Sequence, residues 1–414
     1  MTDVPLYAAG PFVLLLASIA VVPLAAPHWW ERHYPKLTSA LALVVVLYYL
    51  LALRRPARLL LTAEEYVSFI VLIGSLFVVT GGILIRIEGA GTPLVNTTIL
   101  AVGAVISNVL GTTGASALLI RPYLRINEGR LRPFHVVFFI FVVSNVGGLL
   151  TPIGDPPLFL GYLKGVPFFW IFSRVWLIWL LTVAALLVIF YAWEVAGERG
   201  QPPAAEVSRR IEVVGWKNLV FFGAILGAVF LHSPWRELIM AASAWGAYGL
   251  APRPVLAENR FSFGPIREVA IIFAGIFATM VPALDWLEAN AGRLGVSTPG
   301  AFYWGTGALS SVLDNAPTYL NFLAAAFGLH GLSVDNPEHM RFFLANHWKF
   351  IQAVSVGAVF FGACTYIGNG PNFLVKSIAE ESGVPMPSFF GYVLRFTVPV
   401  LLPIFAAVWF FAFR

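Results

Sequence analysis

Long apolar segments recur along the whole chain of 414 residues, and each is near the length that crosses a lipid bilayer. A helix needs about 20 predominantly apolar residues to span the hydrocarbon core. Only 11% of the residues are charged, whereas soluble domains carry about 25%. The sequence therefore predicts an all-α polytopic membrane protein, with spans at 7–26, 37–53, 65–85, 133–150, 168–193, 216–232, 236–251, 265–283, 346–366 and 388–413.

The composition argues against several other classes of protein. The net charge of +5 is small, so nucleic acid is not an expected partner. The single cysteine, Cys364, excludes a disulfide framework and a cysteine-based metal site. No nucleophile–base spacing indicates an enzyme, and no resident cofactor is expected. The first apolar run follows Asp3 without a basic region, which favours a retained span over a cleaved signal peptide.

Two further apolar stretches, about 94–123 and 299–329, carry glycine and polar residues in their middle. Each half of these stretches is too short to span the bilayer alone. We interpret them as re-entrant hairpins that enter and leave on the same face. A single kinked helix in each place is the alternative.

The segment Thr151-Pro-Ile-Gly-Asp-Pro-Pro157 interrupts another apolar run. Proline and glycine both break helices. Irregular backbone at membrane depth survives only where it is buried in protein or lines a polar cavity. An ionisable residue in such a place is a functional candidate, so we expect Asp155 to lie in the substrate site.

The second half of the chain repeats these features. Thr365-Tyr-Ile-Gly-Asn-Gly-Pro371 matches the broken segment at 151–157, and Asp314-Asn315 is matched to Ser107-Asn108 in the other hairpin. We therefore predict a first repeat at 1–193, a polar linker at 194–217 and a second, inverted repeat at 218–414. Inverted repeats with broken helices in corresponding positions indicate the midplane site of a secondary transporter.

Lysine and arginine indicate the orientation in the membrane, because cytoplasmic loops are enriched in them. The richer side holds sixteen of the 26 basic residues, while Arg54, Arg55 and Arg58 count against the assignment. This places both termini outside, with the first hairpin entering from the cytoplasm and the second from outside. The expected location is a bacterial inner membrane.

The motifs at 151–157 and Leu313-Asp-Asn-Ala-Pro-Thr318 resemble those of the ion transporter superfamily. This superfamily includes NhaD-type sodium/proton antiporters, arsenite efflux carriers, and citrate or dicarboxylate transporters. The match is closest to the antiporter-like branch, some members of which are described as citrate transporters. The resemblance implies a scaffold, a transport domain with both hairpins and both broken helices, a homodimer, and elevator-like alternating access. Ser107-Asn108 departs from the Asp-Asn that many relatives carry.

The hairpins and breaks together supply oxygen ligands, which sodium prefers. Two carboxylates close together in a dehydrated site cannot both stay ionised cheaply, so one is expected to exchange a proton for transported sodium. Asp155 and Asp314 are the candidate metal ligands. The predicted ion or substrate site contains Asp155, Asp314, Asn108, Asn315, Asn369, Ser107, Thr112, Thr151, Thr318, Thr365 and Asn145.

These residues leave alternatives open. Two negative charges disfavour an anion, so sodium/proton antiport ranks above transport of citrate, a dicarboxylate or arsenite. Asp155 also fits a simple helix cap before Pro156, and Asp314 fits a bond to hairpin backbone alone. Asn145 fits a helix-packing patch of small residues.

Overall fold

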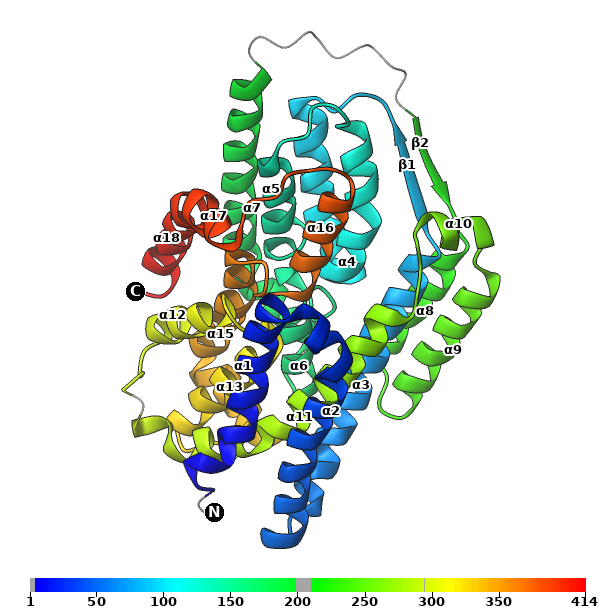
Figure 1. The fold of residues 1–414 in the computed structure, drawn as a ribbon. Helices are drawn as coiled ribbons and strands as arrows, with labels where there is room; N and C mark the ends of the chain where they lie inside the picture. Colours follow the sequence, from blue (N-terminus) through cyan, green and yellow to red (C-terminus); the bar gives the residue numbers. More distant parts are fainter. Residues whose placement is uncertain (1–3, 199–209, 294) are drawn as a thin grey trace.

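The protein is a bundle of helices with one short β-ribbon at its edge (Figure 1). The structure is a computed structural model that describes residues 4–198, 210–293 and 295–414. The first half contains η1 (Leu6–Ala9), α1 (Gly10–Ala25), α2 (Pro27–Leu47), η2 (Tyr48–Ala52), α3 (Pro56–Gly81), β1 (Leu84–Glu88), α4 (Pro93–Ile126), α5 (Pro133–Val142), η3 (Val146–Leu150), α6 (Pro156–Leu163) and α7 (Phe168–Glu198).

The second half opens with the other strand and is otherwise helical. Its elements are β2 (Arg210–Val214), α8 (Asn218–Ala228), α9 (Trp235–Leu250), α10 (Arg253–Glu258), α11 (Gly264–Asn290), η4 (Ala291–Arg293), α12 (Pro299–Ser310), α13 (Asn315–Leu329), α14 (Pro337–Asn346), α15 (Trp348–Phe361), η5 (Gly362–Cys364), α16 (Gly370–Glu381), α17 (Phe389–Tyr392), η6 (Val393–Leu401) and α18 (Leu402–Ala412).

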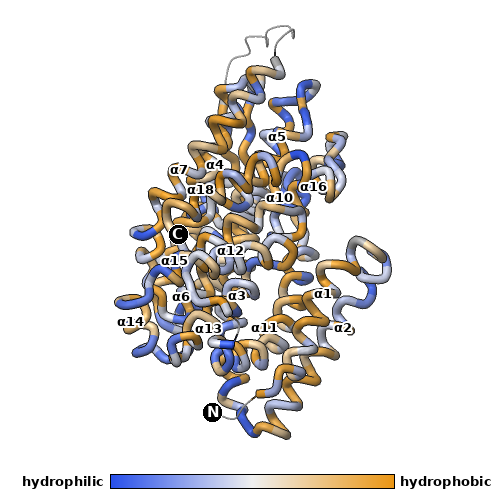
Figure 2. The backbone as a smooth tube through the Cα atoms, turned by 90° about the vertical axis from the view of Figure 1, so that its left-hand side faces the viewer, coloured by the Kyte–Doolittle hydropathy of each residue, from blue (hydrophilic) through white to orange (hydrophobic). Residues whose placement is uncertain are grey.

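Eight helices in the described part of the chain are long and apolar enough to cross a membrane. Long hydrophobic stretches run along α1 and α7, and hydrophilic stretches lie toward the ends of the molecule (Figure 2). This confirms an integral, all-α polytopic membrane protein. The expected spans at 216–232 and 236–251 form shorter helices, α8 and α9, of 11 and 16 residues.

Proline sets the start of many of these helices. Pro27, Pro56, Pro93, Pro133 and Pro299 each occupy the first turn, where the missing N–H costs no hydrogen bond. Prolines in these positions therefore do not interrupt the helices that they begin.

The β-ribbon takes in part of the segment 194–217 that was predicted to be a linker, and its role as a linker stays a prediction. Helix α7 continues to Glu198, and strand β2 pairs with β1 in antiparallel register, with Arg86 opposite Glu212. The Arg86 Nη1 atom lies 3.2 Å from Glu212 Oε2, and such an opposite-charge pair stabilises a ladder. Residues 199–209, including the Gly-Gln-Pro-Pro at 200–203, lie outside the described residues.

Helix α4 turns back on itself at Gly111, whose φ of 77° and ψ of 154° interrupt the helix. The Gly91 N–H donates to the Ile126 carbonyl at 2.8 Å. A straight helix of 34 residues would hold its ends about 50 Å apart, so the single kinked helix is wrong here. Helices α12 and α13 form the second hairpin, in which Phe302 contacts Phe322. Re-entry into the membrane stays a prediction for both.

One contact recurs where each hairpin meets the helix that precedes its break. Ser107 Oγ donates to the Val143 carbonyl, and Ser310 Oγ donates to the Ala358 carbonyl, both at 2.7 Å. Ser107 is therefore equivalent to Ser310, and the sequence match of Ser107 with Asp314 was wrong by four residues. The inverted relation of the halves stays a prediction.

Candidate functional site

The first break separates η3 from α6, and Asp155 is the last residue before α6. Its backbone is extended (φ −143°, ψ 142°), and its side chain makes no capping bond to the helix. The side chain instead points into the protein and is 1% exposed. The interpretation of Asp155 as a simple helix cap is therefore wrong.

Asn369 occupies the corresponding place in the second break. It precedes α16, its backbone is extended (φ −153°, ψ 141°), and its side chain also makes no capping bond. The sequence match between 151–157 and 365–371 thus predicted two residues with the same local conformation. One is an acid and the other a neutral amide.

Three side chains from three separate segments donate hydrogen bonds to the Asp155 carboxylate. Thr112 Oγ1 donates to Oδ1 at 2.7 Å, Asn369 Nδ2 donates to Oδ1 at 3.1 Å, and Asn315 Nδ2 donates to Oδ2. Thr112 follows the turn of the first hairpin, and Asn315 opens α13 in the second. Asp155 is therefore the point where both hairpins and both breaks meet.

A chain of amides surrounds this carboxylate. Asn369 Nδ2 also lies 3.2 Å from Asn145 Oδ1, and Asn145 Nδ2 donates to Asn372 Oδ1 at 2.7 Å. Asn372 in turn donates to the carbonyls of Gly362 and Thr365. Asn145 therefore belongs to this network. The sequence interpretation missed Asn372, although it stands three residues after Asn369 at the start of the half-helix.

Four of the expected site residues bind backbone and fix the shape of the breaks. The Asn108 carbonyl accepts from Thr151 Oγ1, and Asn108 Oδ1 accepts from the Leu150 N–H at 2.8 Å. Thr365 Oγ1 donates to the Ser311 carbonyl at 2.6 Å. Together with Ser107, these residues attach each hairpin to its broken helix.

Asp314 and Thr318 lie at the start of α13, beside Asn315, which donates to the Asp155 carboxylate. The Ala316 N–H donates to Asp314 Oδ1 at 3.0 Å, and Thr318 Oγ1 donates to the Asp314 carbonyl at 2.9 Å. Asp314 therefore caps α13, as the alternative interpretation held. It also places a second acid directly beside Asn315.

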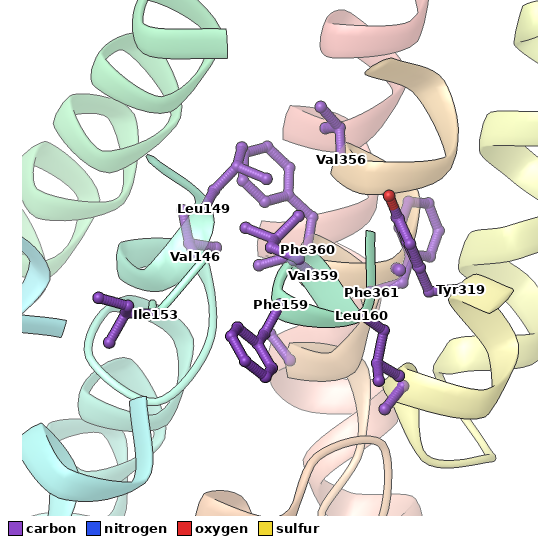
Figure 3. Close-up of a cluster of buried hydrophobic side chains, with 14 of the residues drawn as sticks. Val146, Leu149, Ile153, Phe159, Leu160, Tyr319, Val356, Val359, Phe360 and Phe361 are labelled. Atoms are coloured by element: carbon purple, nitrogen blue, oxygen red, sulfur yellow. The ribbon is translucent and has the colours of Figure 1, made fainter. Parts of the chain in front are cut away.

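Within each break the backbone folds back on itself at very short range. A Cβ added at Gly154 would lie 2.1 Å from the Gly148 carbonyl oxygen, and one at Gly368 would lie 2.7 Å from that of Gly362. Apolar side chains of η3, α6 and α15 surround the first break, including Leu149, Phe159 and Phe360 (Figure 3). The polar cluster therefore lies within a closely packed, apolar part of the protein.

A small cavity of about 40 Å³ lies against the hairpin tip and the break. It is lined by Gly111, Thr112, Gly154 and Pro156, and by Phe77 of α3 on the opposite wall. A water-sized cavity needs only about 10–15 Å³. Water or a small ion therefore fits beside the Thr112 end of the polar cluster.

The charges at the site favour a cation. No described lysine or arginine bonds to Asp155, and its three described partners are neutral. Asn315 Oδ1 is buried and has no hydrogen-bond partner in the described part of the chain, and a buried acceptor without a partner is costly. An alkali cation would supply the positive charge that this set of oxygens lacks.

The described residues contain no group of three or more histidine, cysteine, aspartate or glutamate side chains that would hold a resident metal. A polytopic helical membrane protein with a buried polar site between two interrupted helices has the architecture of a membrane transporter.

A family model described as "Putative citrate transport" matches residues 1–413. The chain belongs to this family of membrane transporters and not to a family of enzymes. No curated protein matches the chain significantly.

Proposed function

We propose that this protein is a secondary active transporter whose coupling ion binds at Asp155, and that it exchanges sodium for protons. The observation that carries the proposal is a fully buried carboxylate bonded by Thr112, Asn315 and Asn369, with no basic partner among the described residues. A charged carboxylate in this position is costly unless a cation or a proton neutralises it. Either ion then permits the conformational change, and the empty charged site does not.

Asp314 is the second acid of the proposal. Its carboxylate stands next to Asn315 and raises the cost of a second negative charge near Asp155. Sodium is cargo in this scheme, and Asp155 with the amide and hydroxyl oxygens around it would hold the ion. We further propose a homodimer in the bacterial inner membrane.

The proposal is tested with purified protein in proteoliposomes that carry a pre-set pH gradient. Sodium, lithium, potassium and citrate are added in parallel. Sodium should dissipate the gradient, and Asp155→Asn should abolish the response, because the amide cannot exchange a proton for an ion. Glu380→Gln is the control, because Glu380 pairs with Lys376 on the outside of α16. Normal exchange by Asp155→Asn would show that the assignment is wrong.

The second candidate is a citrate carrier coupled to the same ion, and the description of the family favours it. A tricarboxylate would enter beside the start of a half-helix, where the helix dipole favours an anion. Radiolabelled citrate separates the two functions. Citrate uptake driven by sodium or protons, with no sodium/proton exchange in its absence, would select the carrier.

A further inference from the structure

Helix α3 connects two faces of the molecule that differ in their ion pairs and cavities. Its 26 residues extend about 39 Å. Arg58 and Glu65 lie near its start, and Phe77, Thr80 and Gly81 lie near its end, where the β-ribbon follows (Figure 1). We call these the Arg58 face and the ribbon face.

A connected set of ion pairs closes the Arg58 face. Lys164 Nζ lies 2.6 Å from Glu65 Oε1 and also contacts Asp335 Oδ1. Arg58 binds Asp335 Oδ2 at 2.5 Å and Asp285 Oδ1 at 3.0 Å. The side chains of Lys164 and Arg58 are only 3% and 13% exposed. Water therefore screens these pairs little.

Asp335 holds this network together from the loop between α13 and α14. Burial by itself would raise the pKa of Asp335, but Lys164 and Arg58 outweigh burial and hold that pKa below its usual range. Because the carboxylate stays charged, Asp335 ties the Lys164 end of α6 to the Arg58 end of α3.

The ion pairs at the ribbon face are more exposed to water, and larger cavities lie beside them. Two cavities of about 250 and 390 Å³ lie there, and Arg121, Arg260 and Glu381 line both. Phe77 lines the smaller of these two and also the cavity beside Thr112. The pair of Arg260 with Glu381 bridges α16 to the segment after α10, but these side chains are 71% and 55% exposed. Such exposed pairs contribute little.

We propose that Lys164, Glu65, Asp335 and Arg58 form a latch that closes the Arg58 face while the site is approached from the ribbon face. The latch rests on the proposed transport function. Helix α6 carries Asp155 at one end and Lys164 at the other, eight helical residues apart. A movement of α6 with the ion therefore withdraws Lys164 from Glu65 on α3.

The test measures access from the ribbon face by the rate at which a thiol is labelled. Cys364 is buried and is the only cysteine, so Cys364→Ser gives a clean background. Thr113→Cys then reports on the cavity at the hairpin tip. Lys164→Gln should slow maleimide labelling at least threefold, because loss of the latch populates the state closed at the ribbon face. Glu65→Gln should also slow maleimide labelling. Lys164 keeps its contact with Asp335 in this variant, so the variant controls for misfolding caused by the loss of Lys164.

Lys376→Gln is the matched control, because Lys376 pairs with Glu380 within one helix. Its labelling rate should equal that of the background. Unchanged labelling in both latch variants would overturn the proposal. Labelling needs no transport, so this result stays separate from a failure of sodium/proton exchange.

A second experiment replaces the latch with a covalent link. In the Cys364→Ser background, Glu65→Cys and Lys164→Cys are joined by a bifunctional methanethiosulfonate. The linked protein should lose transport of whichever solute the wild type carries, and reduction should restore it. Full transport by the linked protein would also overturn the latch.

Discussion

Asp155 and Asp314 both precede a helix, yet their carboxylates have different partners. Asp314 accepts a backbone N–H of its own helix, whereas Asp155 accepts from three side chains of other segments. The sequence places an acid in each position but contains no sign of this difference. The distinction arises because the turn of each hairpin lies against the break of the first half.

Replacement of Asp314 by asparagine separates its capping role from its charge. Asparagine caps helices about as well as aspartate, so Asp314→Asn should unfold at the same temperature as the wild type. The apparent affinity for sodium should weaken several-fold, because a negative charge next to Asn315 is lost. Sodium-dependent dissipation of a pH gradient measures the affinity. An unchanged affinity for sodium would show that Asp314 only caps α13.

Asn315 donates to Asp155, and none of the residues that the structure describes bonds to its side-chain oxygen. A hydrogen bond to a charged group contributes about 1.5–3 kcal/mol, so Asn315→Ala should weaken sodium binding by roughly 10-fold to 150-fold. Asn321→Ala is the control, because within the described ranges Asn321 Nδ2 donates to the Pro317 carbonyl of the same helix and not to Asp155. Equal sodium titrations for the two variants would contradict the proposed role of Asn315.

At the scale of the element, glycine and proline allowed the sequence to predict both breaks. The Asp155 and Asn369 positions followed from the shared Thr, Ile, Gly and Pro. The hairpin register did not, because the similar pairs Ser107-Asn108 and Asp314-Asn315 are not equivalent in space. In the register of Ser107 with Ser310, Thr112 corresponds to Asn315, and both residues donate to Asp155. Their chemical types differ, so their equivalence was visible only from tertiary contacts.

Gly154 lies where the backbone of the first break folds back onto Gly148, so it is sensitive to any side chain. Gly154→Ala would place a Cβ 2.1 Å from the Gly148 carbonyl oxygen, so the backbone must shift next to Asp155. We expect transport to fall at least tenfold and the protein to lose about 1–3 kcal/mol of stability. Gly370→Ala is the matched control beside Asn369, since nothing lies within 4 Å of its added Cβ. Thermal unfolding and vesicle assays compare the pair.

For the whole molecule, the composition and the apolar runs were enough to predict the class of fold. They did not predict the β-ribbon, because Leu84–Glu88 and Arg210–Val214 are short and pair across 121 residues of intervening chain. In the sequence analysis Arg58 counted against the predicted orientation, because basic residues were assumed to lie in loops. The structure shows it paired with Asp285 and Asp335 instead, so its charge serves a tertiary contact.

Sodium binding should stabilise the folded protein as a whole. A ligand at 100 times its dissociation constant adds about 2.7 kcal/mol to the free energy of unfolding. Thermal unfolding in detergent should therefore shift to higher temperature with sodium chloride relative to choline chloride, and Asp155→Asn should lose the shift. A shift of equal size in the variant would place the cation elsewhere.

The β-ribbon has a consequence for how the chain can be assembled. Strand β1 lies just before the first hairpin, and β2 lies at the start of the second half, so hydrogen bonds fasten the two halves independently of the peptide that joins them. The chain expressed as two separate polypeptides, divided between residues 198 and 210, should therefore recombine in the membrane. The co-expressed fragments should copurify and restore transport. Each half could then be mutated and labelled separately.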